Sequence, residues 1–178
     1  QVLRDAGRLE ESKRLLQEGV VLARNQEDRY LEAQYCSDLA LTALMNAEYQ
    51  EAIELATQSL GILRDLNLEV QTTTDLTTIA TSALACNNRQ TALTAALSAL
   101  QILDACHGDG PDFPHRDYWR SALVLKASGH NEQAEAALIS ARHLLLAKAE
   151  KIADPMIRES FINNVSFNRE IWQGMEEL

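Results

Sequence analysis

The stretch richest in reactive side chains lies between two helical segments, at residues 106–115. It contains Cys106, His107, Asp109, Asp112 and His115, which are soft and hard metal ligands within ten residues. Their spacing fits none of the Cys and His patterns of zinc sites. Two glycines and two prolines in the same stretch are enough to explain it as a turn. We therefore expect a loop here, with no metal and no cofactor.

Other signs of catalysis are missing from the sequence. Acidic residues fall mostly on the expected solvated faces of helices, so no carboxylate pair can be singled out for acid–base chemistry. The phosphate-binding pattern G-x-x-x-x-G-K-[ST] does not occur. We expect that this chain is not an enzyme.

The composition predicts an all-α protein. The chain has 178 residues, of which 46% are hydrophobic, so a substantial core can be buried. Only three prolines and seven glycines occur, and no run alternates apolar and polar residues as a half-buried strand would.

The charge argues against two classes of partner. The formal net charge is −10, from 26 acidic and 16 basic residues, and the pI is about 4.8. Binding to nucleic acid or to an anionic membrane surface needs clustered Lys and Arg, so neither is expected.

The cysteines and the ends of the sequence bear on location. Cys36, Cys86 and Cys106 are too few and too scattered for a disulfide framework, so reduced thiols in the cytoplasm are expected. No signal peptide is recognisable, and no apolar run reaches the roughly 18 residues that cross a bilayer. The sequence starts at Gln1, without Met and within a repeat, which suggests a fragment of a longer protein.

The elements that would position any site are repeats of one amphipathic helix, best seen at residues 47–63. Small residues recur in the second helix of each unit at intervals of 40, 40 and 42, at Ser12, Ala52, Ala92 and Ala134. Seven positions later a second small residue follows each time, at Gly19, Ser59, Ala99 and Ala141. The preceding helices give a third series, at Ala40, Ala80 and Ala122. Small side chains let two crossing helices approach closely, so the register predicts tightly packed helix hairpins.

These hairpins can be bounded from the register. After a helix at residues 8–25, we expect three antiparallel pairs, at 28–45 with 48–66, 68–86 with 89–105, and 115–128 with 131–152. The turns at Ala47, Asn87 and Gly129 favour left-handed caps.

The last segment, residues 153–178, differs from the array at residues 1–152. Asp154 is placed to cap a short helix whose first position is Pro155. This helix and a second one should cover the end of the array through Ile157, Phe161, Ile162, Ile171, Trp172 and Met175.

With this register, the chain resembles tetratricopeptide repeat proteins. The matching pieces are GRLEESKRLLQEG (7–19), AEYQEAIELATQSL (47–60), NRQTALTAALSAL (88–100) and GHNEQAEAALISA (129–141). The resemblance implies a right-handed α-solenoid of about three and a half antiparallel hairpins with a C-terminal capping helix. The family's period is about 34 residues, whereas the period here is 40–42, and the family's proline after the second helix is absent.

The C-terminal stretch LLLAKAEKIADPMIRESFINNVSFNREI (144–171) is similar to the ends of large bacterial multidomain proteins. In those proteins a tetratricopeptide array follows a signalling ATPase module, sometimes with a nucleotide cyclase or a DNA-binding domain. The resemblance implies a regulatory or scaffolding segment whose ATPase would lie outside this sequence.

The concave groove of such an array is lined by the first helices of the hairpins. Candidate partner-binding residues on these helices are Gln34, Ser37, Leu41, Thr74, Thr77, Thr81, Arg116, Trp119, Arg120, Leu123 and Lys126. Tetratricopeptide co-chaperones hold a carboxylate tail with Lys, Arg and Asn on this face. The Ser37, Asp38, Leu41 and threonine side chains here depart from that clamp and argue against a chaperone-tail receptor.

The C-terminal end of the predicted groove is locally basic, with Trp119 as an aromatic anchor, which would suit a partner with an acidic residue beside an apolar one. The other interpretation is that Trp119 and Leu123 pack under the neighbouring hairpin or the cap.

We expect a protein-interaction module of a larger signalling protein. The alternative is a sensor domain that binds a small molecule or its own upstream ATPase or cyclase domain.

Overall fold

The computed structural model describes residues 8–174, and this part of the chain contains helices and no strand. The all-α prediction is therefore confirmed for the described residues. The helices, in chain order, are α2 (Leu9–Asn25), α3 (Arg29–Met45), α4 (Tyr49–Asp65), the short 3-10 helix η1 (Glu69–Thr72), α5 (Thr73–Ala85), α6 (Arg89–Ala105), α7 (Pro114–Ala127), α8 (Asn131–Glu150), α9 (Pro155–Asn163) and α10 (Ser166–Gln173).

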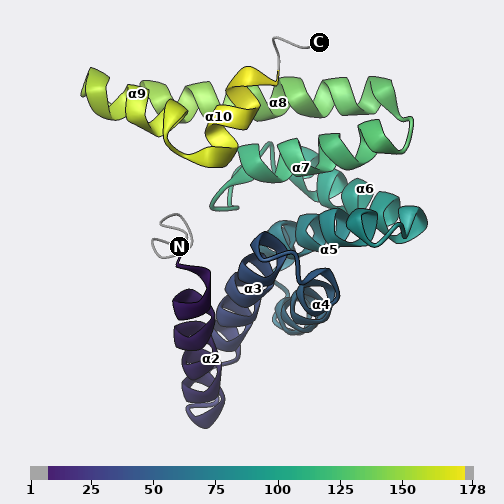
Figure 1. The fold of residues 1–178 in the computed structure, drawn as a ribbon, viewed down its shortest axis with the longest axis vertical. Coiled ribbons are helices and arrows are strands. Elements are labelled where there is room, and N and C mark those ends of the chain that lie inside the picture. Colours follow the sequence, from purple (N-terminus) through teal and green to yellow (C-terminus); the bar gives the residue numbers. More distant parts are fainter. Residues whose placement is uncertain (1–7, 175–178) are drawn as a thin grey trace.

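Successive helices pack against one another along the chain. The three predicted pairs, α3 with α4, α5 with α6 and α7 with α8, are all in contact. We call α3, α5 and α7 the first helices, and these also contact one another, α3 with α5 and α5 with α7. Figure 1 shows the helix direction changing in stages from α2 to α8, with α9 and α10 lying along α8. The first helices therefore form a continuous row through the molecule.

The turns between paired helices have the predicted left-handed residues. The φ angles are 58° at Ala47, 60° at Asn87 and 83° at Gly129. In each turn the next backbone N–H donates to a carbonyl five residues back, as His130 does to Leu125 at 2.9 Å. This bond satisfies a carbonyl at the helix end and reverses the chain.

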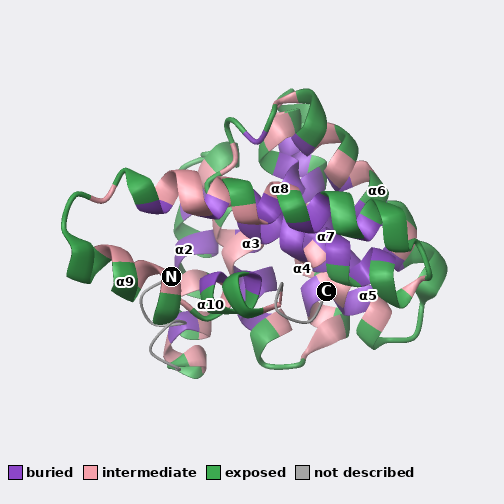
Figure 2. Cartoon of the chain, turned by 90° about the horizontal axis from the view of Figure 1, so that it is seen from above, coloured by how far each residue is buried: buried purple, intermediate pink, exposed green. Residues whose placement is uncertain are grey.

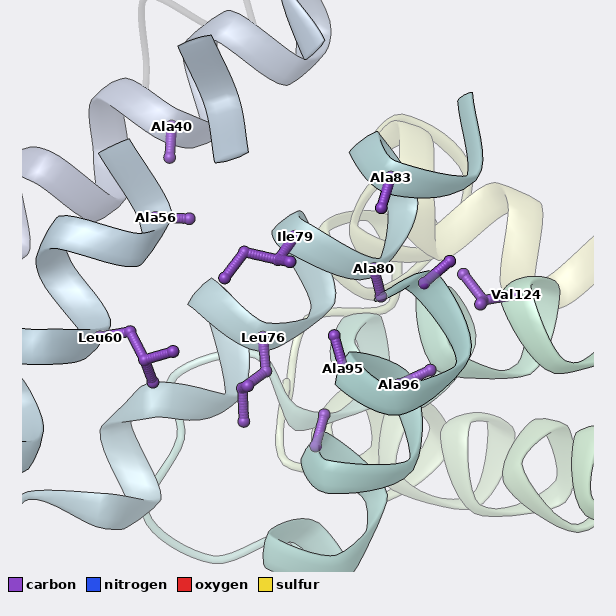
Figure 3. Packing of buried hydrophobic residues seen from close by; sticks show 12 residues of the cluster. Ala40, Ala56, Leu60, Leu76, Ile79, Ala80, Ala83, Ala95, Ala96 and Val124 are labelled. Atoms are coloured by element: carbon purple, nitrogen blue, oxygen red, sulfur yellow. The ribbon is translucent and has the colours of Figure 1, made fainter. Parts of the chain in front are cut away.

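The small residues of the register lie where helices cross. Ala52, Ala80, Ala92 and Ala99 are fully buried, at 0% exposure. The other members of the three series, namely Ser12, Gly19, Ala40, Ser59, Ala122, Ala134 and Ala141, are buried as well. Figure 3 shows alanines of α3, α4, α5 and α6 in one buried cluster with Leu60, Leu76, Ile79 and Val124. The prediction of close helix crossings at these positions is confirmed.

One predicted helix is divided in the structure. A single helix was expected at residues 68–86, but η1 precedes α5 and the α-helix begins at Thr73. The Thr72 hydroxyl donates to the Glu69 carbonyl at 2.6 Å, which supports the tighter 3-10 turn. The 3-10 turn leads directly into α5, since Thr72 and Thr73 both have right-handed helical φ and ψ angles.

The tail packs on the last hairpin mainly through α10. Ile171 is 1% exposed and joins a cluster with residues of α6, α7 and α8, and Phe161 packs against the same cluster. Asp154 caps α9 as predicted, since its carboxylate accepts from Met156 N at 2.8 Å, with Pro155 in the first turn.

One part of the cap prediction is wrong, and another lies outside the described residues. The expectation that Ile157 faces inward is wrong, because this side chain is 59% exposed and no residue of α9 is buried (Figure 2). The carboxylate cap and Pro155 fix where α9 begins, but they do not fix which of its faces meets α8. Met175 and the N-terminal residues 1–7 lie outside the described residues.

Candidate functional site

An open groove of about 340 Å³ lies between α3, the start of α5, the loop 110–113 and the start of α7. Five of the eleven predicted partner-binding residues line it, namely Gln34, Ser37, Leu41, Thr74 and Arg116. These residues come from three successive first helices, so the repeat register brings them together although they are up to 82 positions apart (116 − 34).

The loop that carries the candidate metal ligands forms one wall of this groove. Gly110 has a φ of 103°, and a β-carbon there would lie 2.8 Å from Val70 Cγ1, so only glycine suits this approach. Lys148 Nζ donates to the Asp112 carbonyl at 2.6 Å, and the Phe113 ring meets Phe167 edge-on at 5.9 Å. The loop is thus anchored to η1, α8 and α10.

The candidate metal ligands themselves diverge. The Cys106 thiol donates to the Leu103 carbonyl at 3.5 Å, and His115 Nε2 lies 3.1 Å from Asn168 Oδ1. Within residues 8–174, no group of three or more His, Cys, Asp or Glu side chains has the geometry to hold a metal ion.

A buried carboxylate, Asp117, organises the polar contacts between α5 and α7. It is 0% exposed and accepts hydrogen bonds from the hydroxyls of Thr73 at 3.2 Å, Thr74 at 3.0 Å and Thr77 at 3.3 Å. Arg116 Nε donates to the same carboxylate at 3.2 Å, and Arg116 Nη2 donates to Thr74 Oγ1 at 3.0 Å. Hydrogen bonds of this number, one of them charge-assisted, satisfy the buried carboxylate and fix its position between α5 and α7.

This network corrects the prediction of an exposed basic end of the groove. Arg116 is only 6% exposed, and its guanidinium is already bonded to Asp117 and Thr74. Sequence reasoning missed Asp117. The available signal was a lone acid in the first turn of a helix that must pack against a threonine-rich neighbour.

A second buried carboxyl, Asp75 of α5, has no such partners. It is 0% exposed, and neither of its carboxylate oxygens makes a hydrogen bond. Its pKa is raised from 3.8 to about 7, mainly by burial; the nearby hydroxyls of Ser37 and Ser59 act to lower it, and the acids Asp117 and Asp38 act to raise it. The Ser59 hydroxyl, which lines the groove, is also buried without a partner. Both serines are therefore near enough to act on the carboxyl without reaching hydrogen-bonding geometry.

The remaining predicted residues do not line the groove. Thr77 is buried beneath it, at 0% exposure, and Thr81 donates to the Thr77 carbonyl at 2.8 Å. Trp119 is 8% exposed and packs in the cluster that contains Ile171, so the prediction of an aromatic anchor open to a partner is wrong. Leu123 is 44% exposed, and Arg120 and Lys126 share its helix outside the groove. The cap covers the tryptophan, as the alternative interpretation expected, but leaves the leucine open.

Two further findings concern membrane-spanning helices and the relation of the chain to known proteins. No helix in residues 8–174 has both the length and the apolar composition needed to cross a membrane. No protein-family model matches the chain, and no curated protein matches it either.

Proposed function

We propose that the chain is a protein-interaction module, a right-handed α-solenoid of the tetratricopeptide type that binds a partner segment in the groove along its first helices. The supporting observation is that groove residues chosen from the repeat register on α3, α5 and α7 line one cavity of about 340 Å³. An accessible cavity shared by successive repeats is where stacked hairpins present a continuous binding surface.

The polar lining suits an extended peptide. Gln34 and Gln71 are exposed side chains with both donors and acceptors, and Tyr30 adds a hydroxyl at the rim. Such groups can pair with the backbone N–H and C=O groups of a segment that has no secondary structure of its own. On this proposal the module belongs to a larger cytoplasmic signalling protein and acts as its scaffold or regulatory segment.

A second candidate function rests on the same cavity. A volume of about 340 Å³ lies within the range of small-molecule sites, so a sensor of a small ligand fits the same walls. If the partner is an upstream ATPase or cyclase domain of the same protein, the groove would bind a segment of that domain, as in the first proposal.

The test is selection of random nine-residue displayed peptides on the protein, followed by titration of the selected peptides into two variants. Ser37→Arg places a large side chain in the groove, whereas Ser98→Arg changes an equally half-buried serine on α6, away from the groove. We expect Ser37→Arg to weaken binding by at least about tenfold, through loss of roughly 1.4 kcal/mol, and Ser98→Arg to have no effect. Equal binding to both variants, or no selected peptide at all, contradicts the proposal.

A further inference from the structure

We propose that the groove selects a segment carrying an arginine or lysine, whose cationic head lies over Ser37 and Ser59 against the acidic floor of the groove. This inference rests on the proposed function, and it names the chemistry of the partner that the groove would recognise.

The charges around the groove favour a cation. Asp38 and Asp112 line it and Asp75 lies behind it, with Lys148 beside Asp112, while the ion pair of Asp117 with Arg116 adds no net charge. Arg116 is the basic residue among the lining side chains of the described chain, and its bonds to Asp117 and Thr74 leave it committed to the protein. Acids in a partly dry cleft concentrate the field and attract positive charge.

The floor also contains polar groups that lack partners. Ser59 Oγ and both oxygens of Asp75 are buried and make no hydrogen bond. Buried polar groups are nearly always paired, and those that are not call for an explanation such as a ligand. A guanidinium or ammonium group supplies only donors, which is what an unpaired carboxylate and a hydroxyl can accept.

The rim suits the aliphatic part of such a side chain. Tyr30 and Tyr35 of α3 line the groove beside Gln34. Tyrosine rings pack against the methylene groups of Lys and Arg and attract their cationic heads. Tyr30 is the exposed ring that such a side chain can meet, because the Tyr35 ring packs on α2 beside Gly19.

Cation binding should be coupled to a proton. The ionisable groups that face Asp75 are Asp38 and Cys36 from α3 and Asp117 from α7, while α4 contributes the uncharged Ser59. Burial raises the pKa of Cys36 to about 11, so its thiol stays neutral. A bound cation stabilises the ionised carboxyl of Asp75 and releases its proton, so affinity should rise as the pH passes through about 7.

The experiment is an NMR titration of the protein with N-acetyl-arginine methylamide, and in parallel with the neutral citrulline analogue. We expect the arginine probe to shift the signals of Gln34, Ser37 and Thr74, with about tenfold higher affinity at pH 8 than at pH 6. The citrulline probe should cause no comparable shift. Equal shifts with both probes, or none with either, overturn the inference.

Three variants sharpen this test. Gln34→Lys should weaken binding of the arginine probe about two- to fivefold by charge repulsion, whereas Gln90→Lys, at a matched exposed glutamine on α6, should not. Asp75→Asn should remove the pH dependence of binding while the helix content by circular dichroism is retained. If Asp75→Asn keeps the pH dependence, the carboxyl is not the group that the cation meets.

The two proposals can fail separately. Displayed peptides that bind the groove without enrichment in Lys or Arg would uphold the interaction module and contradict the basic partner. If the arginine probe binds but no displayed peptide binds the groove, the interaction module is contradicted and the groove binds a small cationic ligand instead.

Discussion

Two buried ionisable side chains of the first helices, Asp75 in α5 and His115 in α7, have opposite surroundings. Both are nearly inaccessible, at 0% and 1% exposure. His115 Nε2 lies 3.1 Å from Asn168 Oδ1, and Asn168 in turn donates to the Phe161 carbonyl at 2.8 Å. The cap therefore supplies a partner for His115 Nε2, although Nδ1 has none, whereas within the described chain neither carboxylate oxygen of Asp75 has one.

The difference separates a side chain that the fold pairs at one ring nitrogen from a carboxyl that it leaves without a hydrogen bond. Burial lowers the pKa of His115 from 6.5 to about 4, with Lys148 and Arg116 adding to the shift, so the imidazole is neutral near pH 7. Burial raises the pKa of Asp75 to about 7, so its carboxyl is half ionised there. The polar pair under the cap is structural, while the carboxyl under the groove is available for a ligand.

The largest expected change in stability comes from removing the packing under the cap. Ile171→Ala removes a side chain that is 1% exposed in the cluster under the cap, which should cost about 2–5 kcal/mol in the free energy of unfolding. Urea denaturation measures this loss. Ile157→Ala, at a position 59% exposed in the same tail, should change the free energy by less than about 0.5 kcal/mol. Equal effects of the two substitutions would show that α10 does not anchor the cap.

The second prediction concerns the pH dependence of stability that the Asp75 carboxyl causes. Between pH 3.8 and about 7 the folded protein binds more protons at Asp75 than the unfolded chain does, so this group lowers stability as the pH rises. Asp75→Asn removes that dependence. Its stability relative to the parent protein should therefore increase by about 3 kcal/mol from about pH 4.5 to about pH 7.5. Parallel stability curves for the two proteins would place the pKa of Asp75 near its ordinary value.

The third prediction concerns His115, whose contribution to stability changes with pH in the opposite direction to that of Asp75. The stabilising contribution of neutral His115 is present above pH 6.5 and is lost as the pH falls toward about 4. The stability of His115→Gln relative to the parent should therefore decrease by about 2–3 kcal/mol from about pH 4.5 to about pH 7.5. Chemical denaturation at several pH values tests both variants together. In the parent these two contributions have opposite signs and similar size, so each is seen only in the difference between variant and parent. A difference for His115→Gln that stays constant over this pH range would contradict the lowered pKa of His115.

The sequence was sufficient for the parts of the fold that depend on local spacing. Ala52, Ala92 and Ala134 predict close crossings because a helix needs a small residue at each crossing, whatever its partner. The caps at Asp154 and Gly129 are likewise local, since they depend on a few neighbouring backbone groups.

The candidate site was predictable only in part, because burial of polar residues depends on distant partners. Helical spacing placed Arg116 and Trp119 on one accessible face, but α7 is surrounded by α5, α6, α8 and α10. The bond from Arg116 to Thr74 joins residues 42 positions apart, and no periodicity in the sequence reveals it. Gln34 and Ser37 line the groove because α3 keeps one side open.

The most direct test of the account is the pKa of the Asp75 carboxyl, measured by carbon-13 NMR with and without N-acetyl-arginine methylamide. We expect a value of about 7 in the free protein and a lower value when the arginine probe is bound. A midpoint near the ordinary 3.8 in the free protein, or one that the probe leaves unchanged, would contradict the claim that this carboxyl awaits a cationic ligand.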